Sequence, residues 1–272
     1  MGMRYSHMAC RRALSKSGLP GLDYALNPYF GCEHGCLYCY SPSVFRNEWV
    51  AENWGNFSVA KLNIRQVLEA ELRSRRRGIV GVGTVTDPYQ PYEAKLELTR
   101  GCIEALIRSG FRPSIQTKSD LVLRDADVAL PGLLDLGVTI TTMDGWLAER
   151  LEPKAASPDA RANALEEFSK MGIETWVFFG PIIPTLNDGD DAIRSVARVA
   201  KLTGSELLYD KLNLRQFVLH RLAPALEDLG VDPERVRALS EGPGRYREAL
   251  YNRVESICGE VGVRARPAFK YP

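Results

Sequence analysis

The sequence lacks the features that mark several special classes of protein. No apolar run approaches the ~20 residues that a membrane-spanning helix needs, so we expect no membrane association. The basic residues near the N-terminus are not followed by an apolar segment, so we expect no secretory signal. Neither sign of charge dominates, since 35 basic residues stand against 34 acidic ones. The net charge of +1 excludes a strongly electropositive field around the whole protein, though not a local basic patch.

The composition is that of an ordinary globular protein. Apolar residues make up 45% and charged residues 25% of the 272 residues. These proportions exclude a disordered chain, a collagen-like chain and a coiled coil. The length suits a single α/β domain of the barrel type, for which about 250 residues is usual.

Short apolar segments alternate with longer amphipathic ones along most of the chain. The short segments predict strands, and the longer ones predict helices. About six such units are too few for a complete eight-unit barrel, so the sequence predicts an α/β fold with an open, partial (β/α)6 barrel. We expect strands over residues 23–30, 79–85, 114–118, 138–142, 173–179 and 207–217, and helices over 63–77, 94–109, 125–136, 159–171 and 188–202.

The same pattern divides the chain into three parts. Residues 1–22 predict a basic N-terminal arm, and residues 23–218 predict the partial barrel. Residues 219–272 predict a short helical C-terminal extension packed on the barrel. No composition shift or Gly/Ser-rich stretch indicates a linker between independent domains.

Three of the 6 cysteines form the most informative motif. Cys32, Cys36 and Cys39 have the spacing C-x3-C-x2-C directly after the first predicted strand. Three thiolates on one compact loop can each hold one iron of a cubane cluster, which is normally held by four. No fourth cysteine is near, so one iron would stay open to a ligand that the protein does not supply.

Other interpretations of these cysteines and glycines are weaker. A Cys3His zinc site would use His34, but His34 lies between two of the cysteines and no second knuckle follows. Gly81 and Gly83 half-resemble a dinucleotide-binding loop, but Thr86 replaces its third glycine. Two of the remaining cysteines, Cys102 and Cys258, lie in predicted helices and are expected in the core, whereas Cys10 is undecided.

The cysteine loop and several further motifs together resemble the radical S-adenosylmethionine superfamily, and within it the spore photoproduct lyase-like branch. The matches occur in order over more than half of the chain, which makes the combination specific. The matching stretches are Asn27-Pro28-Tyr29-Phe30-Gly31-Cys32, Tyr38-Cys39-Tyr40, Ser41-Pro42, Gly83-Thr84-Val85-Thr86-Asp87-Pro88-Tyr89-Gln90, Thr117-Lys118-Ser119, Leu151-Glu152-Pro153 and Ser157-Pro158.

The resemblance implies a [4Fe–4S] cluster on Cys32, Cys36 and Cys39, with S-adenosylmethionine as the second cofactor. In that superfamily the cluster donates an electron that cleaves the cofactor to methionine and a 5′-deoxyadenosyl radical, which abstracts hydrogen from the substrate. It implies an enzyme with lyase or related radical chemistry. An external reductant such as a ferredoxin or flavodoxin, and an oxygen-sensitive cluster in a reducing cytoplasm, are expected with it.

The remaining site residues are expected at the carboxyl ends of the barrel strands, where barrel enzymes keep their active sites. The resemblance implies that Thr84, Thr86 and Asp87 bind the methionine end of the cofactor, and that Lys118, followed by Ser119, pairs with its carboxylate. After the next two strands, the ribose hydroxyls are within reach of Thr141 and Thr142, and the rigid apolar backbone of Pro181 and Ile182 suits packing against adenine.

Two tyrosines flank the third cysteine, and the resemblance implies that they line the cofactor. One of the two, Tyr38 or Tyr40, would help to pass a hydrogen atom. The sequence departs from the family at one position. Spore photoproduct lyases carry a hydrogen-donating cysteine where this chain has Thr84, whose O–H bond is too strong for that role.

The substrate is poorly specified by the sequence, which leaves a nucleic acid lesion or modified base, a peptide and a small molecule open. A basic run of Arg73, Arg75, Arg76 and Arg77 could contact phosphates or simply end a helix. The aromatic residues Trp49, Trp54 and Phe57 could stack on a base, line a pocket or cover the cluster. A different class of function, a non-catalytic zinc or Fe–S module that binds nucleic acid, would predict zinc and no cofactor cleavage.

Overall fold

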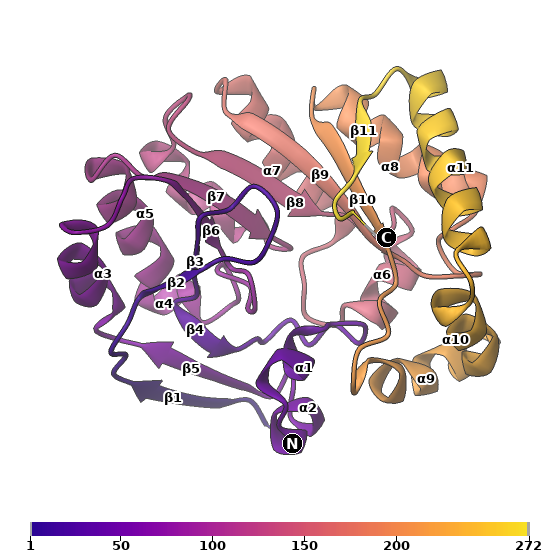
Figure 1. The fold of residues 1–272 in the computed structure, drawn as a ribbon, viewed down its shortest axis with the longest axis horizontal. Helices are drawn as coiled ribbons and strands as arrows, with labels where there is room; N and C mark the ends of the chain where they lie inside the picture. The colour runs from indigo at the N-terminus through magenta and orange to yellow at the C-terminus, as the bar shows by residue number, and fades with distance from the viewer. Residues whose placement is uncertain (1, 271–272) are drawn as a thin grey trace.

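The computed structural model describes residues 2–270 and contains two β-sheets. The main sheet has 8 strands in the order β11-β10-β9-β8-β7-β6-β3-β2. It curves around a central space, and most of the helices pack along its outer face (Figure 1). Pairing is parallel throughout except between β2 and β3. Within residues 2–270 the sheet does not close into a barrel.

Six of these strands confirm the predicted barrel units. They are β3 (Tyr24–Leu26), β6 (Ile79–Val82), β7 (Arg112–Thr117), β8 (Asp135–Thr139), β9 (Glu174–Ile182) and β10 (Glu206–Lys211). Since neighbouring strands are parallel, all of their carboxyl ends meet at one edge of the sheet. That edge is where the sequence analysis places the site residues.

The crossover helices are α3 (Ile64–Leu72), α4 (Glu93–Leu96), α5 (Leu98–Arg108), α6 (Gly145–Leu151), α7 (Pro158–Lys170) and α8 (Asp190–Leu202). The helix predicted over 125–136 is wrong. A 3-10 helix, η1 (Asp120–Val128), begins earlier because the Ser119 hydroxyl accepts from the Leu121 amide and caps it. The chain then turns at Gly132 into β8.

The N-terminal segment is more ordered than the predicted basic arm. Strand β1 (Arg4–Met8) pairs in parallel with β5 (Phe57–Lys61), and β4 (Tyr29–Gly31) pairs with the other side of β5. Together they form a separate sheet of 3 strands beside the cysteine loop. Strand β2 (Leu14–Lys16) joins the edge of the main sheet. Two short helices, α1 (Ser41–Phe45) and α2 (Glu48–Glu52), lie between β4 and β5.

The C-terminal extension is not purely helical, which corrects the sequence-based prediction. Helices α9 (Val218–Asp228), α10 (Pro233–Glu241) and α11 (Arg245–Val261) are followed by a strand, β11 (Ala265–Pro267). This strand pairs in parallel with β10 and extends the main sheet (Figure 1). Helix α11 therefore acts as one more crossover helix, with its N-terminus near the carboxyl ends of the strands.

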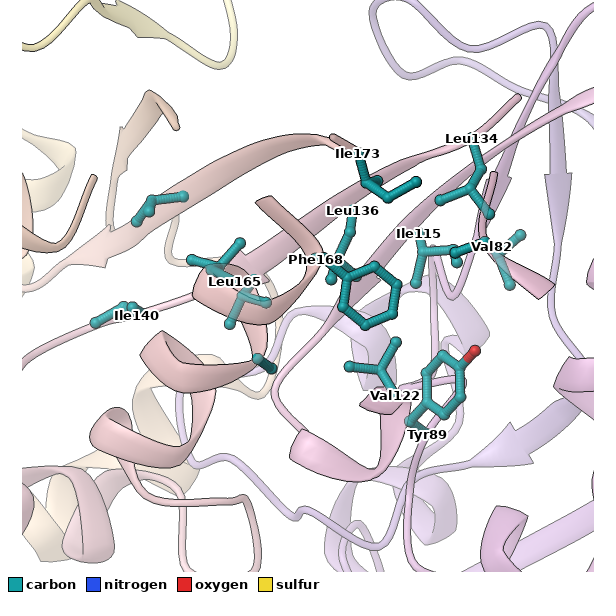
Figure 2. Packing of buried hydrophobic residues seen from close by; sticks show 14 of the residues in the cluster. Val82, Tyr89, Ile115, Val122, Leu134, Leu136, Ile140, Leu165, Phe168 and Ile173 are labelled. Atoms are coloured by element: carbon teal, nitrogen blue, oxygen red, sulfur yellow. The ribbon is translucent and has the colours of Figure 1, made fainter. Parts of the chain in front are cut away.

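The largest core cluster fills the space between the sheet and its outer helices. Phe168 and Leu165 of α7 pack near Leu136 and Ile115 of the strands (Figure 2). Buried residues from β2 and from α11 belong to the same cluster, so the N-terminal and C-terminal parts share one core with the barrel. Along β7 the side chains alternate, with Ile115 packed outward and the side chains of Ser114, Gln116 and Lys118 lining the inner cavity.

Candidate active site

A cavity of about 950 Å³ lies on the inner side of the curved main sheet. Its walls contain many of the residues singled out in the sequence. These are Cys32, Cys36, Tyr38, Cys39, Tyr40, Thr84, Thr86, Asp87, Lys118 and Pro181. Residues that are separated by more than half of the chain therefore meet around one space that is large enough for a cofactor and part of a substrate.

The cysteine loop is shaped by close approach between two backbones. Gly35 has φ +64°, and a Cβ atom placed there would lie 3.0 Å from the Cα atom of Gly55. Only glycine combines that backbone angle with so close a contact. Around the loop, Cys32 packs with Trp54 and Phe57. These two aromatic residues thus cover the cysteine loop, which was one of the roles open to them.

The acidic residue inside the motif anchors the loop to the N-terminal strand, and the sequence analysis missed it. The buried carboxylate of Glu33 accepts from the Tyr5 hydroxyl at 2.7 Å and from the Tyr92 amide at 2.5 Å. The Glu33 amide donates to the Gln90 side chain at 3.0 Å. The only sequence signal was an acidic residue between cysteines, which does not reveal partners so far away.

His34 is engaged by a carboxylate. Its Nδ1 atom lies 3.3 Å from Asp87, and both residues are buried. Burial would raise the pKa of Asp87, but His34, the Thr117 hydroxyl and the Lys118 amide bring it down to about 2. This pairing accounts for His34 without a role as a zinc ligand.

A second residue that the sequence analysis missed reaches the loop from α9. The Arg221 guanidinium donates to the carbonyl oxygens of Gly35, Cys36 and Cys39 at 3.4, 3.0 and 3.5 Å. Burial lowers the pKa of Arg221, whereas the neighbouring thiols would raise it if ionised. The contact supplies a fixed positive charge beside three cysteines, from a residue 182 positions beyond Cys39.

The three thiols are the donor type that holds iron–sulfur clusters, but within residues 2–270 no three His, Cys, Asp or Glu side chains are grouped so that they could hold a metal ion. Burial raises the pKa of the Cys36 thiol to about 12, and burial with nearby Asp87 raises that of Cys32 well above its usual range. Buried thiols of this kind ionise readily only when a metal centre takes the thiolates. Lys118 and Arg221 supply positive charge beside them.

The residues that follow β6 and β7 face the cavity and also contact residues of the cysteine loop and its flanks. Thr86 donates to the Gly31 carbonyl at 2.5 Å, and Tyr40 donates to the Thr84 carbonyl at 2.5 Å. The Lys118 ammonium lies 5.7 Å from the centre of the Tyr38 ring. The structure thus brings Lys118 and the two tyrosines to the same side of the cavity as the cysteines.

Four predicted cofactor contacts do not reach the cavity wall. The Thr141 hydroxyl donates to Glu152 at 2.8 Å, in a buried network that also contains Tyr38 and Arg161. Thr142 accepts from the Asp144 amide, Ser119 caps η1, and Ile182 is buried in the core. Their strand-end positions matched the pattern, but their side chains serve the loops behind the cavity.

The other cysteines and the glycine pair have structural surroundings. Cys102 and Cys258 are buried in the core cluster, as expected. The backbone of Cys10 exchanges hydrogen bonds with the Asn63 side chain. After Gly83 no helix begins until Glu93, so the dinucleotide-type loop lacks the helix that it requires.

The family model of the radical SAM superfamily matches residues 26–196. The chain belongs to the radical SAM superfamily. An uncharacterized protein of Mycobacterium tuberculosis is 32% identical to this radical SAM protein over 292 residues, covering 98% of this chain and 84% of the relative. One from Methanocaldococcus jannaschii is 33% identical over 180 residues, covering 65% of this chain and 67% of the relative.

Solved structures share the fold. Spore photoproduct lyase with bound AdoMet and dinucleoside spore photoproduct superposes with a TM-score of 0.72 at 14% identity, covering 98% of this chain and 82% of the lyase. A radical SAM methyltransferase from Sphaerobacter thermophilus superposes with a TM-score of 0.58 at 16% identity, covering 90% and 65%. Family membership implies an iron–sulfur cluster and S-adenosylmethionine. None of the helices within residues 2–270 is long and apolar enough to cross a membrane.

Proposed function

We propose that this protein is a radical S-adenosylmethionine enzyme whose [4Fe–4S] cluster is held by Cys32, Cys36 and Cys39. One observation carries the proposal. All three cysteines lie on the wall of a single cavity of about 950 Å³, together with Lys118 and the residues that end β6. The three cysteines would leave one iron open beside the cavity, where S-adenosylmethionine would bind, and together the two cofactors would supply a 5′-deoxyadenosyl radical.

The chain positions the cofactor through groups of complementary charge. Lys118, a point charge at the end of β7, suits the carboxylate of the methionine moiety. The side chains of Thr84, Thr86 and Asp87 lie on the neighbouring wall, after β6. Pro181 faces the cavity at the end of β9 and offers an apolar surface for adenine.

The two tyrosines receive different roles in this proposal. The hydroxyl of Tyr38 is buried and hydrogen-bonded to Thr141 and Glu152, so Tyr38 supports the cavity wall. The Tyr40 hydroxyl donates to the Thr84 carbonyl, but Tyr40 remains 38% exposed at the cavity, so it is the better placed of the two to meet a substrate and pass a hydrogen atom. Thr84 lines the cavity, and by the resemblance it takes the place of the lyases' cysteine donor. We therefore propose radical chemistry that does not depend on a thiol at that position.

The reductant is proposed to be a ferredoxin or flavodoxin in a reducing cytoplasm, because an open iron is oxygen-sensitive. The substrate classes proposed are a nucleic acid lesion or modified base, a peptide and a small molecule. The basic run Arg73–Arg77 lies between α3 and β6, at the amino ends of the strands and away from the cysteines. This position argues against a role of that run in presenting substrate to the cluster.

The test is an anaerobic assay of reconstituted protein with dithionite and S-adenosylmethionine, in which 5′-deoxyadenosine is quantified. We expect product from the wild type and from Cys10→Ala, and none from the Cys32→Ala, Cys36→Ala, Cys39→Ala triple variant. Iron and zinc are measured on the same samples. Bound zinc with no product would overturn the proposal in favour of a non-catalytic nucleic-acid-binding module. A full iron load without product, in the presence of candidate substrates of each class, would leave only a structural cluster.

A further inference from the structure

The inner face of the main sheet carries two aromatic side chains that the proposed cofactor contacts do not use. Trp176 and Phe178 lie two residues apart on β9, so both point to the same face of the strand. Both line the cavity of about 950 Å³, and each is half-buried, which leaves part of each ring accessible from the cavity. Ligand cavities typically combine such aromatic surface with a few polar groups that fix the orientation of the ligand.

The ring of Trp176 is held in one orientation by two contacts. Its indole N–H donates to the Asp135 carboxylate at 2.9 Å, and that carboxylate also accepts from the Ser114 hydroxyl at 2.6 Å. Its ring atoms lie against Gly137, where an added Cβ atom would come within 2.2 Å of them. Any side chain at position 137 would therefore push the ring away. The indole thus rests on the sheet, with its opposite face toward the cavity.

The strand register places an amide side chain at the same level as this ring. Gln116 of β7 pairs with Gly137 of β8, and Gly137 pairs with Trp176 of β9. The three residues form one row across the sheet, with about 10 Å between the first and the last strand. Because the indole covers Gly137, the ring extends from β9 toward β7 and shortens this gap. Gln116, which also lines the cavity, therefore stands at the edge of the surface that the indole presents.

The Gln116 amide has hydrogen-bonding capacity to spare. Its Nε2 atom donates to the Thr139 hydroxyl at 3.2 Å, which fixes the side chain. Within residues 2–270 the carbonyl oxygen and the second N–H of this amide have no partner. A primary amide presents a donor and an acceptor side by side. The complementary group is a lactam, in which a ring N–H stands next to a ring carbonyl oxygen.

We propose that the substrate of the radical reaction carries a planar ring with a lactam edge, which stacks on Trp176 and forms hydrogen bonds with Gln116. The link to the radical reaction rests on the proposed function, whereas the ring site itself does not depend on it. Lys118 lies two residues beyond Gln116, about 7 Å nearer the carboxyl edge of the sheet. A ring on Trp176 would therefore lie deeper in the cavity than the proposed cofactor, with Phe178 adding apolar surface on the side of the cysteines.

Binding of uracil to the full-length chain tests the ring site without any cofactor. Uracil carries the lactam edge, and dimethyluracil, methylated at both ring nitrogens, keeps the planar ring but has no N–H. Ligand-observed NMR titration gives the Kd of each. We expect the wild type to bind uracil about tenfold more tightly than dimethyluracil, because the methylated ring leaves the Gln116 carbonyl oxygen without a donor.

Four variants separate stacking from hydrogen bonding. Gln116→Leu should bind the two ligands equally, since it removes the amide and keeps the length of the side chain. Trp176→Leu should weaken both ligands about tenfold or more, and Trp176→Phe, which keeps an aromatic face, should stay within about threefold of the wild type. Trp146→Leu removes an exposed tryptophan outside the cavity and should change neither Kd.

A purely structural role of Gln116 would not change the preference between two ligands, so this preference decides the outcome. The proposal is overturned if Gln116→Leu keeps the tenfold preference for uracil, or if the wild type binds neither ligand. Unchanged binding in a Trp176→Leu variant that is folded by its Tm overturns it as well. If Trp176→Leu does not fold, Gln116→Leu and Trp176→Phe still give the comparison.

Two further measurements identify the source of the ring and its link to the reaction. A trinucleotide with uracil at its centre that binds more tightly than uracil, and loses affinity in Trp176→Leu, assigns the ring to a nucleic acid strand. Binding of free uracil alone assigns it to a small heterocycle. In the reconstituted enzyme, saturating uracil should change the rate of 5′-deoxyadenosine formation at least twofold, and an unchanged rate would overturn the link to the radical reaction.

The ring site and the proposed function can fail separately. The triple cysteine variant should bind uracil as the wild type does, because none of the cysteines belongs to the row of Gln116, Gly137 and Trp176. A wild type that forms no 5′-deoxyadenosine but binds uracil would overturn the proposed function and leave the ring site standing. Absence of uracil binding in an enzyme that forms 5′-deoxyadenosine would overturn the ring site alone.

Discussion

The two ends of the main sheet carry the same kinds of charged residues and use them differently. At the amino end, Arg112 lies 3.3 Å from Asp135 and 2.5 Å from Glu174, and Arg266 lies 2.9 Å from Glu206. At the carboxyl end, Lys118 faces the Tyr38 ring and Arg221 holds backbone carbonyls. Within residues 2–270 neither Lys118 nor Arg221 forms an ion pair with a carboxylate.

The difference is one of pairing, because Arg112 and Arg266 line the same cavity as Lys118 but are paired with carboxylates. Arg112 and Arg266 each have a carboxylate on a neighbouring strand, so these charges cancel where the strands begin. At the carboxyl end, Asp87 pairs with His34, and Glu152 pairs with Arg161. The positive charges of Lys118 and Arg221 lie beside the three thiols, where anionic groups would bind. Three comparisons of matched variants and one double variant test the two ends of the sheet, from the largest expected effect to the smallest.

The largest effect is expected from Gly35→Ala, with Gly132→Ala as its control. Both glycines have positive φ, but only Gly35 contacts another backbone, and nothing lies within 4 Å of a Cβ at Gly132. The added methyl group at Gly35 must displace the cysteine loop, so reconstituted Gly35→Ala should hold less than half of the wild-type iron. Gly132→Ala should hold the full amount, at a cost of about 1 kcal/mol in stability. Equal iron in both variants would show that the loop tolerates a shift.

Glu152→Gln is expected to cost about 3 kcal/mol in the free energy of unfolding, because it leaves Arg161 buried without its partner. Glu174→Gln at the amino end, where the carboxylate is exposed, should cost less than about 1 kcal/mol. Urea denaturation at pH 7 measures both.

The pH dependence of the Glu152 effect has a defined sign. Burial would raise the pKa of Glu152, but the Arg161 guanidinium and then Lys118 lower it below its ordinary value. A lowered folded pKa means that the stabilisation is present above about pH 4.3 and is lost as the pH falls through the folded value. The difference between wild type and Glu152→Gln should therefore shrink in acid. A stability difference that stays constant as the pH falls would contradict an ionised Glu152–Arg161 pair.

Arg221→Gln should loosen the cysteine loop without unfolding the protein. The glutamine is too short to reach three carbonyls, so iron should be lost to a chelator about tenfold faster than from the wild type. Arg112→Gln, at the amino end, should lower Tm by a few degrees and leave the rate of iron loss unchanged. Faster iron loss in Arg112→Gln than in Arg221→Gln would invert the comparison.

The smallest effect is expected from the double variant Arg73→Gln, Arg76→Gln. Both side chains are exposed at the amino end, between α3 and β6. Binding of a short oligonucleotide, followed by fluorescence anisotropy at two salt concentrations, should differ from the wild type by less than twofold. A salt-sensitive loss of binding would move the nucleic-acid contact to this basic run.

Local sequence patterns predicted the repeating units of the fold well. The strand predicted over residues 79–85 is β6, and the helix predicted over 159–171 is α7. These elements depend on neighbours in the sequence, such as the cap Ser157, whose hydroxyl accepts from the Ala160 amide. The pairings of β1 with β5 and of β11 with β10 could not be predicted, because short edge strands acquire their structure from distant partners.

The same distinction applies to the candidate site. The cysteine spacing and the strand-end positions of Thr84 and Lys118 were readable because they follow local motifs. The orientation of Thr141 was not, because it depends on the buried partners Tyr38 and Glu152. Arg221 carried no signal at all, since an arginine in an amphipathic helix is ordinary until the packing of α9 is known.

The anchoring of the cysteine loop by Arg221 has a consequence for biosynthesis. Cys39 is translated 182 residues before the arginine that holds its carbonyl. At about 5–20 residues per second, that interval lasts on the order of 10–40 s. During that time the emerging thiols lack one of their supports, and α9 has not yet formed. The full set of contacts around the cysteine loop is therefore completed only on a nearly complete chain.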